Sequence, residues 1–238
     1  MKNVLIYNIV NSKERYPKDT LVRTLQAQID NSLELGWKVE DIVIGTNFEF
    51  EYMGVKAHQL DNVCEYNPFV NKWYGMLELV EKGILKEDFW FHDQDNWQLY
   101  PIEFPSFDGE IAGCTYVFTP EWNTASMFIK KSAVNILQYI KEFMDLNHEL
   151  NLFSDENYIA ILRAQTEVSP YLSTINNEYN VGITKMEDRY NAENKPVKVI
   201  GVKPENKQDI EKLQGVNLVQ ARLLTDEILT IFGKYSLL

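Results

Sequence analysis

Two acidic residues at the end of a short aromatic run are the side chains best placed to do chemistry. Residues 88–96 read DFWFHDQDN, so Asp93 and Asp95 follow the bulky residues 89–91. An unbroken apolar run is typical of a strand buried on both faces of a sheet, and ligands of open α/β sheets bind at the carboxyl ends of strands. Two carboxylates separated by one residue can point to the same side of an extended chain. The pair therefore suits a hard divalent cation and a diphosphate bound to it.

The same acids also have a structural interpretation. Short acidic motifs recur by chance, and a surface turn capped by acids would have this sequence. The order and spacing of the remaining segments decide between the two interpretations.

Composition limits the possible classes of protein. The chain has 238 residues, of which 45% are hydrophobic and 13% aromatic, which is enough for one α/β domain and unlike a disordered chain. No apolar stretch approaches the roughly 18 residues that span a bilayer, so we expect no membrane span and a location in the cytoplasm of its cell or host. Cys64 and Cys114 are too few for a disulfide framework. A net charge of −12 argues against sequence-independent binding to nucleic acid.

The elements that must position the acids alternate along the first half of the chain. Residues 3–10 predict a strand, and Thr20 begins a helix that Gly36 ends. Residues 67–69 lead into a second helix, which runs directly into the strand at 88–91. The other strands expected in this half lie at 41–45, 55–60 and 110–117, with an aromatic, proline-rich loop between 97 and 107.

The second half is more mixed. A strand at 126–129 precedes a helix, and Ser154 is placed to cap a helix at 155–163. The first-turn acids Asp155 and Glu156 suit the positive end of a helix dipole, so capping alone would explain them. Further strands are expected at 176–181 and 197–202, and further helices at 208–213 and 218–232. The whole pattern predicts an α/β sheet that binds its ligand at the carboxyl ends of its strands.

Three segments together resemble the GT-A nucleotide-sugar glycosyltransferases. The DxD region of that family, in which a helix leads into an apolar strand ending in the acidic pair, is similar to NKWYGMLELVEKGILKEDFWFHDQDNW. The strand and helix that line the donor-sugar site are similar to WNTASMFIKKSAVNIL, and the helix start that bears an acid near the acceptor is similar to FSDENYIAIL. The segments lie between residues 71 and 162 in the order of the family, and their combined spacing is more specific than any one motif.

The resemblance implies a fold and a domain plan. The α/β fold would be a GT-A fold, which is Rossmann-like, with a mostly parallel central sheet flanked by helices and a small antiparallel part in the C-terminal half. Residues 1–238 would form a single domain. Its first half, 1–119, would bind the nucleotide, and its second half, 120–238, would bind the donor sugar and the acceptor.

The resemblance also implies a reaction, the transfer of a sugar from a nucleotide diphosphate sugar to an acceptor hydroxyl. Asp93 and Asp95 would hold Mn²⁺ or Mg²⁺, which neutralises the departing diphosphate as a Lewis acid. Asp155 or Glu156 would be the catalytic residue, acting as a general base in an inverting enzyme or orienting the sugar in a retaining one. The second and third segments are more similar to retaining members of the family.

The predicted donor contacts come from both halves of the chain. The first three lie at or just beyond the carboxyl end of the first strand, where a base or a phosphate can be held. The full set is Tyr7, Asn8, Arg15, Lys72, Asp93, Asn123, Ser126 and Lys203.

One position departs from the family. Many metal-dependent relatives supply a late histidine as a further metal ligand, followed by Lys and Pro that contact the diphosphate. The corresponding run, VIGVKPENK, keeps Lys203 and Pro204 but has Gly201 and Val202 where the histidine is expected. Water, His92 or an oxygen side chain would then complete the metal shell, and Lys203 would gain importance as a point charge on the diphosphate.

Two other functions fit the residues. A non-catalytic nucleotide- or carbohydrate-binding protein would keep the sheet without turnover, and a metal-dependent nucleotidyltransferase would also cluster acids at strand ends. The second is disfavoured because no glycine-rich phosphate loop such as GxxxxGK or GxGxxG is present. The acceptor is open among a glycan, a lipid-linked sugar, a protein side chain and a modified DNA base.

Overall fold

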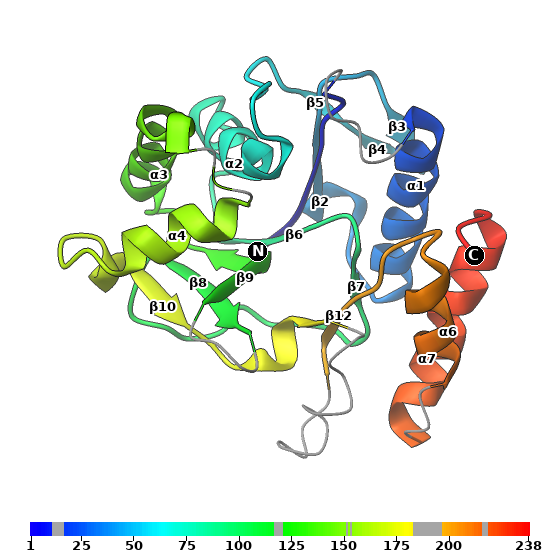
Figure 1. Cartoon of the computed structure of the whole chain (residues 1–238). Helices are drawn as coiled ribbons and strands as arrows, with labels where there is room; N and C mark the ends of the chain where they lie inside the picture. The colour runs from blue at the N-terminus through cyan, green and yellow to red at the C-terminus, as the bar shows by residue number, and fades with distance from the viewer. Residues whose placement is uncertain (11–16, 117–120, 151, 153, 183–196, 216–218) are drawn as a thin grey trace.

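A mostly parallel sheet runs through the centre of the molecule (Figure 1). The structure is a computed structural model that describes residues 1–10, 17–116, 121–150, 152, 154–182, 197–215 and 219–238. Within these residues seven strands form the central sheet, in the order β10-β8-β9-β6-β1-β2-β5. Here β9 is antiparallel to both of its neighbours and the other described pairs are parallel, which confirms the predicted fold class. The strands are β1 (Lys2–Tyr7), β2 (Ile42–Thr46), β5 (His58–Gln59), β6 (Phe89–His92), β8 (Ile111–Thr115), β9 (Trp122–Ile129) and β10 (Leu172–Thr174).

Smaller sheets lie outside the central one. The strand β12 (Val199–Gly201) pairs antiparallel with β7 (Asn96–Gln98) and parallel with β11 (Val181–Gly182). The strands β3 (Glu51–Tyr52) and β4 (Val55–Lys56) form a hairpin. The small antiparallel part that the family resemblance implied is therefore present, although one of its strands, β7, comes from the first half of the chain.

Some predicted strands differ from the observed ones. The strand predicted at 55–60 is split, because β4 pairs with β3 and β5 pairs with β2. The strand predicted at 176–181 is wrong for most of its length, because residues 177–179 form a 3₁₀ turn before β11 begins. A loop was predicted where β7 lies, and β10 was not predicted. These short strands form because a distant partner pairs with them, and propensity alone does not reveal such a partner.

Helices cover both faces of the central sheet (Figure 1). One face packs against α2 (Asn71–Glu81), α3 (Val134–Leu146) and α4 (Asp155–Arg163), and the other against α1 (Lys18–Glu34), which in turn packs against α7 (Val219–Lys234). Each predicted helix is present, the last two as α6 (Lys207–Gly215) and α7. Short 3₁₀ turns lie at Val39–Asp41, Pro68–Val70, His148–Leu150, Ser169–Tyr171 and Asn177–Tyr179. Of the helices that the structure describes, none has the length and apolarity needed to cross a bilayer.

The aromatic strand β6 is apolar because both of its faces are covered. Phe89 and Phe91 belong to the same buried cluster as Trp73 of α2, whereas Trp90 belongs to the opposite cluster with Phe128. Burying each such side chain removes enough apolar surface from water to contribute about 1.5–3 kcal/mol. The strand is thereby fixed in the core, and its polar end is presented at the carboxyl edge of the sheet.

A buried carboxylate fixes α2 to the loop before it. Glu78 is 3% exposed, and its two oxygens accept hydrogen bonds from the backbone N–H groups of Asp61 and Asn62, both at 2.8 Å. Lys82 Nζ lies 2.6 Å from Glu78 Oε1. Burial alone would raise the pKa of Glu78, but Lys82 and the two N–H groups outweigh it, so this pKa lies below its ordinary value of 4.5.

We expect Glu78→Gln to lower the free energy of unfolding by about 1.5–3 kcal/mol at pH 7, the usual contribution of hydrogen bonds to a charged group. Because the folded-state pKa is depressed, this contribution is present above the unfolded pKa and is lost as pH falls through the folded pKa. Urea unfolding at pH 7 and pH 3 measures it, with Asp61→Asn as the control because Asp61 is a 76% exposed partner of Lys82. A difference from wild type that stays constant between the two pH values would contradict the prediction.

Candidate active site

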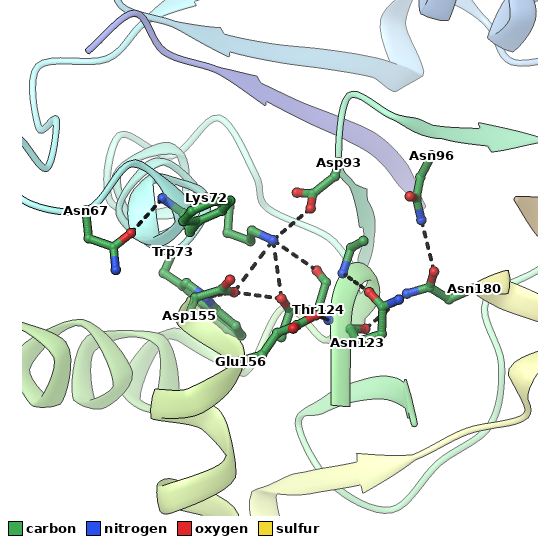
Figure 2. A network of polar contacts seen from close by, with 12 residues as sticks. Asn67, Lys72, Trp73, Asp93, Asn96, Asn123, Thr124, Asp155, Glu156 and Asn180 are labelled. Atoms are coloured by element: carbon green, nitrogen blue, oxygen red, sulfur yellow. Dashed lines mark hydrogen bonds and ion pairs between the residues drawn. The ribbon is translucent and has the colours of Figure 1, made fainter. Parts of the chain in front are cut away.

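A buried ion cluster forms where α2, β6, β9 and α4 meet (Figure 2). Lys72 lies in the first turn of α2, and its Nζ lies 2.9 Å from Asp93 Oδ2 and 3.6 Å from Asp155 Oδ2. The same ammonium donates to Thr124 Oγ1 at 3.3 Å. Its side chain is only 9% exposed. The fold therefore brings together three residues that the sequence predicted, Lys72, Asp93 and Asp155.

Asp155 contributes to the ion cluster and not to helix capping. Ser154, which the sequence predicted as the cap of this helix, forms a capping box with Asn157 at the start of α4. Asp155 is buried, and its Oδ2 accepts hydrogen bonds from Trp73 Nε1 at 2.9 Å and from Thr124 Oγ1 at 2.7 Å. The alternative that capping alone explains the acids of this turn is therefore wrong for Asp155.

Glu156 faces the same region from α4. Tyr116 Oη donates to both of its carboxylate oxygens, at 2.7 and 2.9 Å, and the backbone N–H of Thr124 donates to Oε1 at 3.3 Å. Burial raises the pKa of Glu156, and the hydrogen bond from Tyr116 opposes the rise. Sequence reasoning missed Tyr116, for which the available signal was a polar aromatic residue at the carboxyl end of a predicted strand.

Charge in the cluster is set by burial and by close opposite charges. Burial lowers the pKa of Lys72, but the carboxylates of Asp155 and Asp93 outweigh it, so the net shift is upward and the ammonium stays charged. Burial raises the pKa of Asp93 to about 6, against the opposing effect of Lys72. A buried group stays ionised only if an opposite charge and hydrogen bonds compensate its loss of water. Lys72 compensates the two carboxylates in this way, and Asp93 and Asp155 compensate the ammonium of Lys72.

The acidic loop, residues 93–95, is held by its main chain. Asp93 donates its N–H to Ala125 O at 2.8 Å, and Asp95 O accepts from Val202 N at 2.7 Å. Both carboxylates are partly exposed. Tyr7 is buried at the end of β1, and burial, followed by the charges of Asp95 and Asp93, raises its pKa. The strand β6, which leads into the acidic loop, pairs in parallel with β1. The acidic pair therefore lies beside the carboxyl end of β1.

These residues fit a divalent cation. Two partly exposed carboxylates are enough for Mg²⁺ or Mn²⁺ when water and phosphate oxygens fill the other positions. Among the described residues there is no cluster of three or more His, Cys, Asp and Glu side chains that would enclose the ion alone. His92 does not complete the shell, because Nδ1 contacts Asn96 O and Nε2 contacts Asn3 Oδ1, both at 3.0 Å. Burial lowers the pKa of His92 to about 4, so this core histidine is neutral.

No family model and no curated protein sequence matches the chain. Solved structures do match. An active-site mutant of LgtC is 13% identical with a TM-score of 0.64, over 98% of this chain and 96% of that one. A glycosyltransferase involved in glycosylation of the major capsid of PBCV-1 is 11% identical with a TM-score of 0.57, over 89% of this chain and 97% of that one. The glycosyltransferase GlyE of Streptococcus pneumoniae TIGR4 is 11% identical with a TM-score of 0.57, over 99% of this chain and 64% of that one.

The fold is that of the GT-A-type glycosyltransferases. In this GT-A fold the ion cluster and the acidic loop lie together at the carboxyl edge of β6. The sequence resemblance named the same fold, so that prediction is confirmed.

Polar atoms without partners mark the end of β1 in the GT-A fold. Tyr7 Oη and both side-chain polar atoms of Asn8 are buried and have no hydrogen-bond partner among the described residues. Leaving such a group unsatisfied costs about 1–3 kcal/mol. A polar ligand that satisfied them would recover this cost. Arg15, the third predicted contact of this region, lies outside the residues that the structure describes.

A row of asparagines connects β7, which follows the acidic loop, to β9 (Figure 2). Asn96 Nδ2 donates to Asn180 Oδ1 at 3.1 Å, and Asn180 Nδ2 donates to the main-chain oxygen of Asn123 at 3.0 Å. The side chain of Asn123 accepts from Ala125 N at 3.1 Å. Asn123 was predicted, whereas Asn96 and Asn180 were missed because nothing in their local sequence distinguishes them.

Two predicted donor contacts lie apart from the ion cluster. Ser126 is fully buried, and its Oγ accepts a hydrogen bond from Trp90 Nε1 at 2.8 Å. Its role as a donor contact stays a prediction, and the residue of β9 that contacts the ion cluster is Thr124. Lys203 is exposed and follows β12, next to Val202, whose N–H bonds to Asp95.

Proposed function

We propose that the chain is a glycosyltransferase that moves a sugar from a nucleotide diphosphate sugar to an acceptor hydroxyl. The observation that carries the proposal is the buried contact of Lys72 with both Asp93 and Asp155, beside an acidic loop in a GT-A fold. A protein that used this sheet only for packing would have no need of a buried cation shared by two carboxylates. A structure of the galactosyltransferase LgtC, which has the same fold, holds donor and acceptor sugar analogues.

The donor would lie along the carboxyl edge of the sheet. Tyr7 and Asn8 would bind the nucleoside, because their buried polar atoms lack partners in the described structure. Asp93 and Asp95 would hold Mn²⁺ or Mg²⁺, which when bound neutralises the departing diphosphate. Lys203 would contact the diphosphate from the side of β12 as a point charge. The nucleotide would thus lie mainly on residues 1–119.

The sugar would lie on residues 120–238. Asn123 and Asp155 would orient its hydroxyl groups, and Glu156 would lie beside the anomeric carbon, where its carboxylate stabilises positive charge. Retention of configuration is favoured, because the second and third segments of the sequence are more similar to retaining members of the GT-A family. The bond from the anomeric carbon to the diphosphate breaks, the acceptor oxygen bonds to that carbon, and the acceptor proton leaves with the diphosphate.

Donor hydrolysis tests the proposal. We expect slow release of a nucleoside diphosphate from at least one of the uridine, guanosine, cytidine or thymidine diphosphate sugars, measured by chromatography with Mn²⁺ or Mg²⁺ present. A chelator should stop the release, and added Mn²⁺ should restore it. If no donor of the panel binds and none releases a nucleoside diphosphate, the proposal is wrong.

The same assay separates the rivals. Binding of a donor without release, even with candidate glycan, lipid-linked, protein or modified-DNA acceptors, favours a non-catalytic binding protein. Consumption of a nucleoside triphosphate with release of pyrophosphate favours a nucleotidyltransferase. We expect the chain to act in the cytoplasm.

A further inference from the structure

Helix α1 holds the acidic loop through one buried side chain. Gln28 is fully buried, and its Nε2 donates to Gln94 O at 3.0 Å and to Asn96 O at 2.9 Å. Its Oε1 has no hydrogen-bond partner in the described part of the chain. A buried acceptor without a partner costs about 1–3 kcal/mol, so this glutamine is better suited to holding the loop than to stabilising the core.

Residues 202–205, the Lys203 turn, follow β12 and carry Lys203. The acidic loop contacts its start, where Val202 N donates to Asp95 O at 2.7 Å. At its end Glu205 has a φ of +59°, a left-handed conformation that costs a non-glycine residue energy and persists only if its surroundings enforce it. Here Glu205 N donates to Leu237 O at 2.8 Å, in the segment that follows α7.

Helix α1 also contacts this turn, through Thr20, whose Oγ1 lies 3.4 Å from Glu205 Oε1, and through Arg23. Its Nη2 lies 2.7 Å from Glu205 Oε1, and its Nη1 donates to the main-chain oxygens of Tyr235, at 3.1 Å, and Ser236. The side chains of Arg23 and Glu205 are 33% and 36% exposed, so their ion pair contributes little to stability. The planar guanidinium instead fixes the position of the turn and of residues 235–237 relative to α1.

We propose that Arg23 and Gln28 are positioning residues that anchor the Lys203 turn and the acidic loop to α1, so that Lys203 and Asp95 reach the same nucleoside diphosphate. The two residues lie five positions apart on one helix, and each holds one of the two segments. The inference deepens the proposed function and rests on it. Neither residue touches the donor; each acts through the main chain that carries Asp95 or Lys203.

Binding of a nucleoside diphosphate tests the inference. Calorimetric titration of the wild-type chain with uridine, guanosine and cytidine diphosphate, each with Mn²⁺, identifies the tightest of these probes. We expect Arg23→Gln and Gln28→Met each to raise the Kd for that probe about tenfold, which is within the range for losing a residue that supports a ligand. In donor hydrolysis KM should rise by a similar factor, with kcat within about twofold of wild type, because the reacting groups stay in place.

Matched variants separate positioning from general loosening of the helix pair. Lys234→Met removes another α1–α7 contact, with Asp30, without touching the turn, and should leave Kd and KM unchanged. The double variant Arg23→Gln/Glu205→Gln should bind the probe no more weakly than either single variant, because both act through one contact. Arg23→Lys keeps a cation near Glu205 and should recover part of the affinity.

Each alternative result overturns a defined claim. If the probe binds the wild type and both positioning variants equally, the inference is wrong and the proposed function stands. If Lys234→Met weakens the probe as much as Arg23→Gln does, the effect is loosening of α1 and α7 and the inference is again wrong. If no diphosphate binds the wild type and no donor is hydrolysed, the proposed function falls and takes the inference with it.

Discussion

Replacing Lys72 with methionine is expected to destabilise the fold by about 3–5 kcal/mol at pH 7, since removing one partner of a buried ion pair leaves an uncompensated charge. Asp155 is 3% exposed and would lose its only cation among the described contacts, and Asp93 would lose its ion-pair partner. Sugar release from a donor should fall below detection, because both acids would then be misplaced or protonated. Urea unfolding and donor hydrolysis measure the two effects.

Lys141→Met is the matched control for this variant. Its ammonium pairs with Asp145 on the surface of α3, where ion pairs contribute about 0–1 kcal/mol. Adding Asp155→Asn to Lys72→Met should restore part of the lost stability, since the unpaired charge is then removed as well. A Lys72→Met protein as stable as wild type would show that water reaches the cluster and that the charges are not buried.

Asp95→Asn is expected to lower turnover at least about a hundredfold, because even residues that only support metal ligands cost about 10–100-fold when they are removed. The fold should stay intact. Asp95 is partly exposed, and its contact with Val202 is made by the main-chain oxygen, which the substitution keeps. Thermal unfolding should therefore match that of wild type, and the affinity for Mn²⁺ in the presence of a nucleoside diphosphate should fall.

Asp226→Asn removes an exposed carboxylate on α7 and serves as the control for lost negative charge. It should leave turnover unchanged. Full activity of Asp95→Asn would mean that the acidic loop is structural. An equal loss of turnover in Asp95→Asn and Asp226→Asn would mean that the effect comes from the overall charge of the protein.

Local signals predicted the elements that depend on local chemistry. The helix at 155–163 was predicted with the bounds that α4 has, because Ser154 was recognisable as its cap, and in the structure Ser154 forms a capping box with Asn157. The strand β6 was predicted from its apolar run alone, since cover on both faces demands such a run. In contrast, β7 exists because it pairs with β12, about a hundred residues later, and no nearby residue reveals that partner.

The candidate site was predictable in its acids and less so in the residues that hold them. Asp93, Asp155 and Lys72 lie in segments with recognisable order, and the structure brings them together. An irregularity in the pairing of β8 with β9 decides which residue of β9 reaches the ion cluster: Gly113 pairs with Met127, and Cys114 pairs with Asn123. Extra residues on one strand break the alternation of faces, so Thr124 reaches the ion cluster where an unbroken strand would not present it.

The contact between Trp73 and Asp155 joins residues 82 apart in the chain, and this separation bears on how the protein is made. During synthesis α2 leaves the ribosome long before α4, so the ammonium of Lys72 cannot yet be matched by Asp155. Docking α2 on the sheet at that moment would bury a cation with too few partners, and such burial is unfavourable. The centre of the domain is therefore expected to close only after residue 155 has been translated, which makes assembly of the ion cluster a late event in folding.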